Sequence, residues 1–215
     1  THGSPAFELF TKYFNLISIL GVFTLLFAFF SIQADAFLTL ENLVNVGRQI
    51  APTVIVATMM TLVITTGQID LSVGSIIGLT ASALAIFIAN GSALFGIAAA
   101  LIIAVTAGVL NGVIAAYGKL PAFIVTLASL IALRGVALLM TQGYSTPIKV
   151  DWVLWLGQGK FLGIYIPTWI AAATVLFAWY LFTQTRFGRY VVAAGSNAEA
   201  LRRSGINVKR ILATT

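Results

Sequence analysis

Apolar runs of about 18 residues recur along the whole chain, and short polar segments separate them. A run of this length is sufficient for a helix to cross the hydrocarbon core of a bilayer. The pattern predicts membrane-spanning helices near residues 14–32, 52–66, 71–89, 93–117, 121–141 and 168–182. We therefore expect an all-α integral membrane protein with about six transmembrane helices.

The composition supports this fold class and narrows the possible partners. Hydrophobic residues make up 60% of the chain, charged residues only 8%, and the mean hydropathy is +1.02. Soluble domains contain about 25% charged residues, so a soluble fold is excluded. A net charge of +6 could indicate nucleic-acid binding, but half of the twelve Lys and Arg residues follow residue 185. That clustering favours a cytoplasmic segment beside the membrane, and we expect no nucleic-acid partner.

Two segments outside the spans carry an interfacial pattern. Residues 41–49 combine charges with apolar spacing, which predicts an interfacial helix that leads through Pro52 into the second span. Residues 142–167 form the longest loop and contain Trp152, Trp155 and Tyr165. Because Trp and Tyr accumulate where the bilayer meets water, we expect this loop to lie along the membrane surface.

The distribution of Lys and Arg indicates the orientation. If the N-terminus is cytoplasmic, the inner side carries Lys12, Lys119 and the basic residues after 185, whereas the outer side carries Arg48, Lys149 and Lys160. Cytoplasmic loops of membrane proteins are richer in Lys and Arg, so we expect this orientation. The expected organisation is a cytoplasmic leader at 1–13, a transmembrane domain at 14–183 and a cytoplasmic segment at 184–215.

The cytoplasmic segment contains signals for both ends of a short helix. Ser196 followed by Glu199 predicts a capping box, and Gly205 predicts the C-terminal stop. A helix of about eight residues is only about 12 Å long, so it is too short and too polar to enter the membrane. Since such a helix is marginal alone, we expect it to dock on a partner. The alternative is an ordinary helix of a positively charged cytoplasmic loop.

The segment between the second and third spans carries an acidic residue near the membrane. Asp70 can be the N-cap of the third span or a partner of its helix dipole. The functional alternative is a non-helical element that lines a solute path together with Ser72 and Ser75, as broken helices do in transporters. Both interpretations can hold together.

Polar and small residues also interrupt the fourth and fifth spans. Gly108 and Gly112 form a G-x-x-x-G pattern, which predicts close packing against another helix. Asn111 lies within this pattern and favours an inter-helix hydrogen bond, with a role in a solute path as the alternative. Arg134 is explained by a side chain that reaches the membrane surface, by an inter-helix bond or by a solute contact.

The chain lacks the sequence patterns of catalysis. It has no cysteine, no phosphate-binding loop, no zinc-binding H-E-x-x-H and no recognisable catalytic triad. We therefore expect a protein that is not an enzyme and that binds no cofactor or metal itself. The energy for any transport would come from another protein.

Three sequence blocks resemble one family. They are I-D-L-S-V-G-S at 69–75, P-A-F-I-V-T-L at 121–127 and A-G-S-N-A-E-A-L-R-R-S-G-I-N-V at 194–208. In these blocks the chain resembles the permeases of ribose/xylose-type ABC sugar importers of bacteria. Gln68 stands where many of these permeases have Gly. Because they usually have about ten spans, we expect this chain to be the N-terminal part of a longer permease.

The resemblance implies a function and partners. It implies a permease of the bacterial inner membrane that forms the path for a ribose- or xylose-like monosaccharide. The partners it implies are a second permease subunit, a cytoplasmic ATPase that uses ATP, and an outer sugar-binding protein. It also makes the helix at 197–204 the coupling helix that docks on the ATPase, with these contact residues: Asn197, Glu199, Ala200, Arg202, Arg203, Ser204 and Gly205. The alternative function is a membrane anchor or sensory module that docks a cytoplasmic partner without transport.

Overall fold

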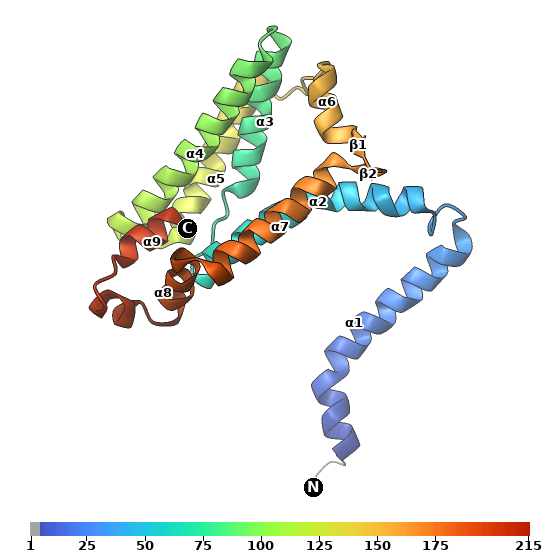
Figure 1. Cartoon of the computed structure of the whole chain (residues 1–215), viewed down its shortest axis with the longest axis horizontal. Coiled ribbons are helices and arrows are strands. Elements are labelled where there is room, and N and C mark those ends of the chain that lie inside the picture. Colours follow the sequence, from blue (N-terminus) through green and yellow to red (C-terminus); the bar gives the residue numbers. More distant parts are fainter. Residues whose placement is uncertain (1–4) are drawn as a thin grey trace. The chain divides into compact units, whose positions relative to one another are not determined.

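The structure is a computed structural model that describes residues 5–215, with side chains from residue 13 onward except at Asn15. Most of the chain is helical (Figure 1). The elements in chain order are α1 (Pro5–Gln33), α2 (Leu40–Thr65), α3 (Val73–Ala89), α4 (Ala93–Gly118), α5 (Ala122–Thr141), α6 (Asp151–Gln158), β1 (Lys160–Phe161), β2 (Ile164–Tyr165), α7 (Ile166–Gln184), α8 (Arg186–Arg203) and α9 (Val208–Thr214).

Five of the described helices are long and apolar enough to cross a membrane, namely α1, α2, α4, α5 and α7. The third expected span, α3, has 17 residues, which give a length of about 26 Å and place it at the lower limit for a crossing. It begins at Val73 rather than near residue 71. The interfacial helix expected at 41–49 is the first part of α2, a continuous helix that contains Pro52.

The chain divides into two compact units, residues 1–47 and 48–215. In the first unit, α1 begins at Pro5, within the expected leader at 1–13; residues 1–4 and the side chain of Lys12 lie outside the described part. The side chains of α1 from Leu16 to Gln33 are not buried. Phe27 packs edge-on against Phe37, with the ring centroids 5.4 Å apart.

Helices α3, α4 and α5 form a three-helix block within the second unit, as Figure 1 shows. A tight turn at Asn90, Gly91 and Ser92 makes α3 and α4 antiparallel neighbours, and Gly91 has a φ of +80° that glycine adopts without strain. Gly96 permits the close approach, since a Cβ there would lie 3.1 Å from the Leu84 side chain. Pro121 then precedes α5 as its N-cap.

A buried apolar cluster joins the C-terminal elements to the end of α2. It contains Leu62, Val191, Ala194, Leu201 and Ile211, and Val191 at its centre has no exposed surface. Since these residues come from α2, α8 and α9, the segment after the last span packs against membrane helices. It is therefore an integral part of the second unit.

The helix α8 contains a break at Asn197, where φ is −155° and ψ is 88°. The Asn197 Oδ1 atom accepts a hydrogen bond from the Ala200 amide at 2.9 Å, so Asn197 is the N-cap of the helical turn at 198–203. We call this turn the surface helix. The predicted N-cap, Ser196, was wrong by one residue. With Asn197 as the cap, a capping box would require an acidic or amide residue at Ala200, and Glu199 cannot fill that role.

The predicted C-terminal stop is confirmed. Gly205 has a φ of +81°, its amide donates to the Arg202 carbonyl at 3.0 Å, and the Ile206 amide donates to the Leu201 carbonyl at 3.4 Å. These two bonds form a Schellman motif, and Ile206 and Leu201 belong to the same apolar packing.

The assignment of Asn197 predicts unequal effects of two neighbouring substitutions. Asn197→Ala removes the cap and should destabilise the surface helix by about 1 kcal/mol. This loss should make amide exchange over 198–203 roughly fivefold faster. Ser196→Ala should leave that exchange unchanged. Hydrogen exchange followed by mass spectrometry measures both, and equal effects would contradict the assignment.

Candidate functional site

Asp70 lies in the non-helical segment between α2 and α3 and forms hydrogen bonds with Ser72, two residues later in the chain. Its Oδ1 accepts hydrogen bonds from the Ser72 amide at 2.7 Å and from the Ser72 hydroxyl at 2.6 Å. Ser72 occupies the N-cap position of α3. The predicted cap role of Asp70 is therefore wrong in its simple form, because the carboxylate holds the N-cap residue and forms an Asx-type turn before the helix.

From Ser72, a chain of hydrogen bonds continues through the three-helix block. Asn111 of α4 donates from Nδ2 to the Ser72 hydroxyl at 2.9 Å, and the hydroxyl of Ser129 in α5 donates to Asn111 Oδ1. Ser72 has no exposed surface and Asn111 is 5% exposed. The network formed by Asp70, Ser72, Asn111 and Ser129 thus joins the segment before α3 to both neighbouring helices.

Two further bonds tie the same region to α5. The Ser75 hydroxyl donates to the Leu130 carbonyl at 2.9 Å, and the Thr126 hydroxyl donates to the Ile69 carbonyl at 3.3 Å. Both hydroxyl groups are buried. Ser75 therefore contributes to the attachment of α3 in this structure, whereas Ser72 holds the network together.

A groove of about 780 Å³ lies beside this network. Its walls come from α4, α5, the segment 68–70 and α9, and most of the lining is apolar. The lining includes Asp70, Asn111, Lys119 and Thr126 as polar residues. A concave, mainly apolar site with a few convergent polar groups is typical of small-molecule binding.

A smaller groove of about 470 Å³ lies between α3 and α5. Its lining includes Ser75, Gly78 and Ser82 on the α3 side and Arg134 on the α5 side. Arg134, for which the sequence left three explanations open, therefore shares this groove with small, weakly polar residues of α3.

Two glycines mark the places where the C-terminal segment touches the membrane helices most closely. A Cβ added to Gly112 of α4 would collide with the Ala213 carbonyl of α9, and one added to Gly195 of α8 would collide with the Thr65 carbonyl of α2. Gly112 therefore packs as closely as the sequence pattern indicates, but against α9. Gly108 has open space around it in the described structure.

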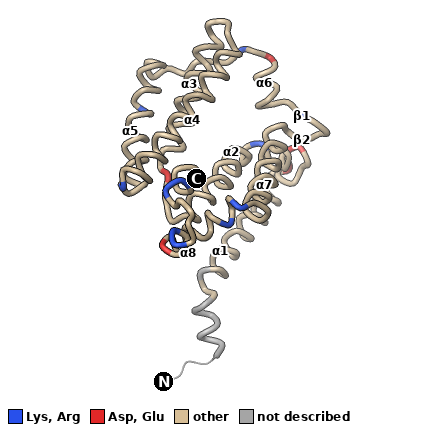
Figure 2. The backbone as a smooth tube through the Cα atoms, turned by 60° about the vertical axis from the view of Figure 1, so that its left-hand side comes forward, with Lys and Arg blue, Asp and Glu red and all other residues tan. Residues whose placement is uncertain are grey.

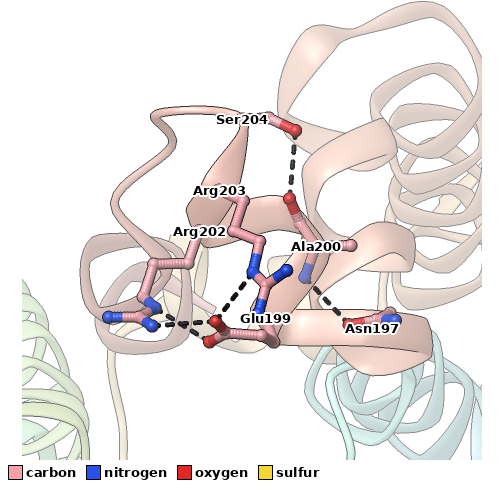
Figure 3. A network of polar contacts seen from close by, with 6 residues as sticks. All are labelled: Asn197, Glu199, Ala200, Arg202, Arg203 and Ser204. Carbon is pink, nitrogen blue, oxygen red and sulfur yellow. Dashed lines mark hydrogen bonds and ion pairs between the residues drawn. The ribbon is translucent and has the colours of Figure 1, made fainter.

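The surface helix presents a network of charges (Figure 3). Glu199 binds Arg202 through two bonds of 2.8 and 2.9 Å and Arg203 through one of 3.1 Å. The hydrogen bond from Arg202, followed by that from Arg203, lowers the pKa of Glu199 below its usual value. A lowered pKa in the folded state means that the pairs persist at neutral pH and are lost only as the pH falls through that lowered value.

The remaining residues predicted for this region lie beside that charge network. Asn197 and Ala200 form the cap, the Ser204 hydroxyl donates to the Ala200 carbonyl at 3.0 Å, and Gly205 ends the helix. Lys and Arg residues gather around this end of the second unit in Figure 2. The structure thus brings the predicted contact residues together on one exposed turn.

Sequence analysis missed Ser129, Thr126 and Gly195. Each is a single small or hydroxyl residue whose partner lies on another element of the fold, and many serines and threonines in such helices bond only their own helix. The one available signal for Ser129 was its occurrence in an apolar span, where a polar group needs a partner.

Comparisons with known proteins match the sequence of this chain to one family. Residues 42–215 match the family model described as "Branched-chain amino acid transport system / permease component". This match covers more than half of the chain and includes every polar site residue named above. The chain belongs to this permease family.

Several curated relatives are named as sugar permeases. The ribose import permease protein RbsC of Escherichia coli strain K12 is 41% identical over 204 residues, which are 92% of this chain and 62% of that protein. The L-arabinose ABC transporter permease protein AraH of Azospirillum brasilense is 34% identical over 203 residues, 93% of this chain and 59% of that protein. The galactofuranose transporter permease protein YtfT of Escherichia coli strain K12 is 34% identical over 173 residues, 80% of this chain and 51% of that protein.

This permease chain spans about three fifths of the length of the first two of these relatives. No solved structure matches it. The family match over residues 42–215 and the five described helices that are long and apolar enough to cross a membrane together indicate a multi-pass membrane protein of this permease family.

The buried network predicts a large effect of one substitution in the permease. Asn111→Ala leaves the Ser72 and Ser129 hydroxyls without their shared partner and should lower the free energy of unfolding by about 1–3 kcal/mol. Ser82→Ala is the matched control, because its hydroxyl bonds only the Gly78 carbonyl of its own helix. Unfolding in mixed micelles compares the two, and equal losses would show that the network contributes nothing specific.

Proposed function

We propose that this chain forms the translocation path of a bacterial ATP-driven importer for a ribose- or xylose-like monosaccharide. The observation that carries the proposal is the surface helix, which is anchored to membrane helices on one side and exposes charges on the other. A membrane channel alone needs no such element. A permease driven by a separate cytoplasmic ATPase does need one.

The two sides of the surface helix differ in burial. Leu201 is 6% exposed and belongs to the apolar cluster with Leu62 and Ile211. The side chains of Arg202 and Arg203 are 70% and 78% exposed, and that of Glu199 is 50% exposed. The apolar side can therefore transmit force into the membrane domain while the charged side contacts a partner of complementary charge.

The glycine contacts give this force two points of application. The first point is Gly195 of α8, which lies against Thr65 at the end of α2, five residues before Asp70. The second is Ala213 of α9, which lies against Gly112, the residue that follows Asn111. Because the hydrogen-bond network ties α3, α4 and α5 together, a displacement of α9 should move the three-helix block as a unit. The groove along α4 would then change its access to either side of the membrane.

The groove supports a small polyhydroxylated substrate. A sugar needs hydrogen-bonding groups at a few positions and apolar surface between them, and Asp70, Asn111 and Thr126 supply such groups beside apolar walls. In the proposal, Asp70 and Asn111 border the path, Ser72 holds these two side chains in place, and Ser75 fixes α3 to α5 beside it. The ribose and arabinose permeases among the relatives are consistent with a monosaccharide.

The remaining partners follow from the proposed mechanism. ATP is bound by a cytoplasmic ATPase and not by this chain, and a second permease subunit completes the path. An extracytoplasmic protein delivers the sugar to the outer side. The proposed orientation places the N-terminus and the surface helix in the cytoplasm and Lys149 and Lys160 outside, in the inner membrane of a bacterium.

The first test separates coupling from assembly. The double substitution of Glu199 and Arg202 by Ala should abolish sugar-stimulated ATP hydrolysis and reduce uptake at least tenfold. A tenfold loss corresponds to about 1.4 kcal/mol of coupling free energy. The membrane subunits should still assemble. The control is the double replacement of Lys149 and Asp151, which are also exposed but lie outside the surface helix. Normal uptake in the first variant would contradict the proposal.

The second test addresses the contact between α4 and α9. Gly112→Ala should uncouple transport from ATP hydrolysis, because the new Cβ collides with the Ala213 backbone and displaces α9. Gly135→Ala in α5 adds the same group in open space outside the lining of the groove and should retain uptake. Uptake and hydrolysis are measured in reconstituted vesicles. If both variants transport normally, force does not pass through Gly112.

A further inference from the structure

The hairpin formed by β1 and β2 has an unusual tip. Its strands pair Lys160 with Tyr165 and Phe161 with Ile164, which leaves Leu162 and Gly163 as the two turn residues. Both have positive φ, 52° at Leu162 and 80° at Gly163. Two-residue turns of this kind favour Asn, Asp or Gly at the first position, yet Leu162 occupies it and is 77% exposed. Neither turn geometry nor packing within the described structure explains an apolar residue there.

The hairpin is folded back onto the first turn of α7. The Trp169 Nε1 atom donates a hydrogen bond to the Phe161 carbonyl at 3.1 Å, and the two rings meet edge-on with centroids 6.3 Å apart. Phe161 is 58% exposed and Trp169 is 41% exposed. The exposed apolar surface of the hairpin tip is therefore continuous with that of α7.

The length of α7 places this surface at a definite depth. Its 19 residues give about 28 Å, whereas the hydrocarbon core of a bilayer is about 30 Å thick. Almost all of α7 is needed for the crossing, so Trp169 in its first turn lies at the edge of the hydrocarbon. Phe161 and Leu162, which fold back to the level of Trp169, then lie at that same edge.

Cationic groups lie on the other side of the hairpin. The Tyr165 ring contacts the Lys160 ammonium, 4.8 Å from the ring centroid, and the Arg48 guanidinium, 4.9 Å from it. Arg48 lies in α2, 17 residues before the end of that helix, so it is also about one bilayer thickness from the opposite surface. An aromatic ring in contact with two cations, next to exposed apolar residues, matches the chemistry of the phospholipid headgroup region.

We infer that the hairpin at 160–165 is a lipid anchor that inserts Phe161 and Leu162 into the bilayer edge and holds Lys160 at the phosphate level. The lipid surface explains the exposed Leu in a turn position that favours Asn. The anchor would fix the depth of α7 and, through Tyr165 and Arg48, the depth of α2. This inference does not depend on the transported substrate or on the coupling mechanism.

A depth measurement on the assembled transporter in phospholipid nanodiscs tests this inference. The chain has no cysteine, so Leu162→Cys can carry a single nitroxide label. The ratio of its accessibility to oxygen over a water-soluble nickel chelate should be severalfold higher than for Tyr144→Cys, which labels a loop position that is also 77% exposed. Leu176→Cys in the middle of α7 gives the value for the hydrocarbon interior.

Two results would overturn the inference. A ratio at residue 162 equal to that at residue 144 would place the tip no deeper than the loop that contains Tyr144, and loss of access to both reagents would show that protein covers it, as expected for docking of an outer protein. A second variant tests the geometric cause. In the Trp169→Ala background the label at 162 should shift toward the value of residue 144, whereas an unchanged depth would mean that the contact with Trp169 does not place the hairpin.

Discussion

Polar groups inside a membrane protein must find partners within the protein, because hydrocarbon offers none. In this permease the requirement is met by one chain of hydrogen bonds from Asp70 through Ser72 and Asn111 to Ser129. The bonds cross three elements that are distant in sequence. They fix the non-helical segment before α3, the packing of α4 and α5, and one wall of the main groove.

The same region is where the C-terminal segment at 186–215 meets the membrane-spanning helices. Gly112 follows Asn111 directly, and its missing side chain lets the α9 backbone touch α4. The apolar cluster around Val191 connects α9 with the surface helix and the end of α2. A path of packed contacts therefore runs from the surface helix that carries Arg202 and Arg203, through α9, to the groove.

Much of this fold could be predicted from the sequence because hydrocarbon thickness imposes a length on every span. The end of the surface helix at Gly205 was also predictable, because glycine adopts the positive φ of this position without strain. The start of the surface helix was not. Ser196 and Asn197 are both good N-cap residues, and burial of Ala194 and Leu201 on either side accompanies the choice of Asn197.

Asp70, Ser72 and Asn111 of the site could be predicted from the sequence, but Ser129 and the hydrogen-bond pairings could not. Asp70 and Asn111 drew attention as polar residues in apolar surroundings, whereas their link through Ser72 and Ser129 depends on how three helices pack. The pattern around Gly112 predicted close packing but not its partner, because α9 follows a hundred residues later.

The central claim is that the surface helix and α4 move together when the ATPase acts. The most direct test is the distance between nitroxide labels at Arg203→Cys and Val109→Cys in the assembled transporter, measured by electron-electron resonance with and without ATP. The account predicts an unchanged distance while the water accessibility of the label at 109 changes with ATP. A distance that changes together with that accessibility would show that the surface helix moves independently of α4, and would contradict the account.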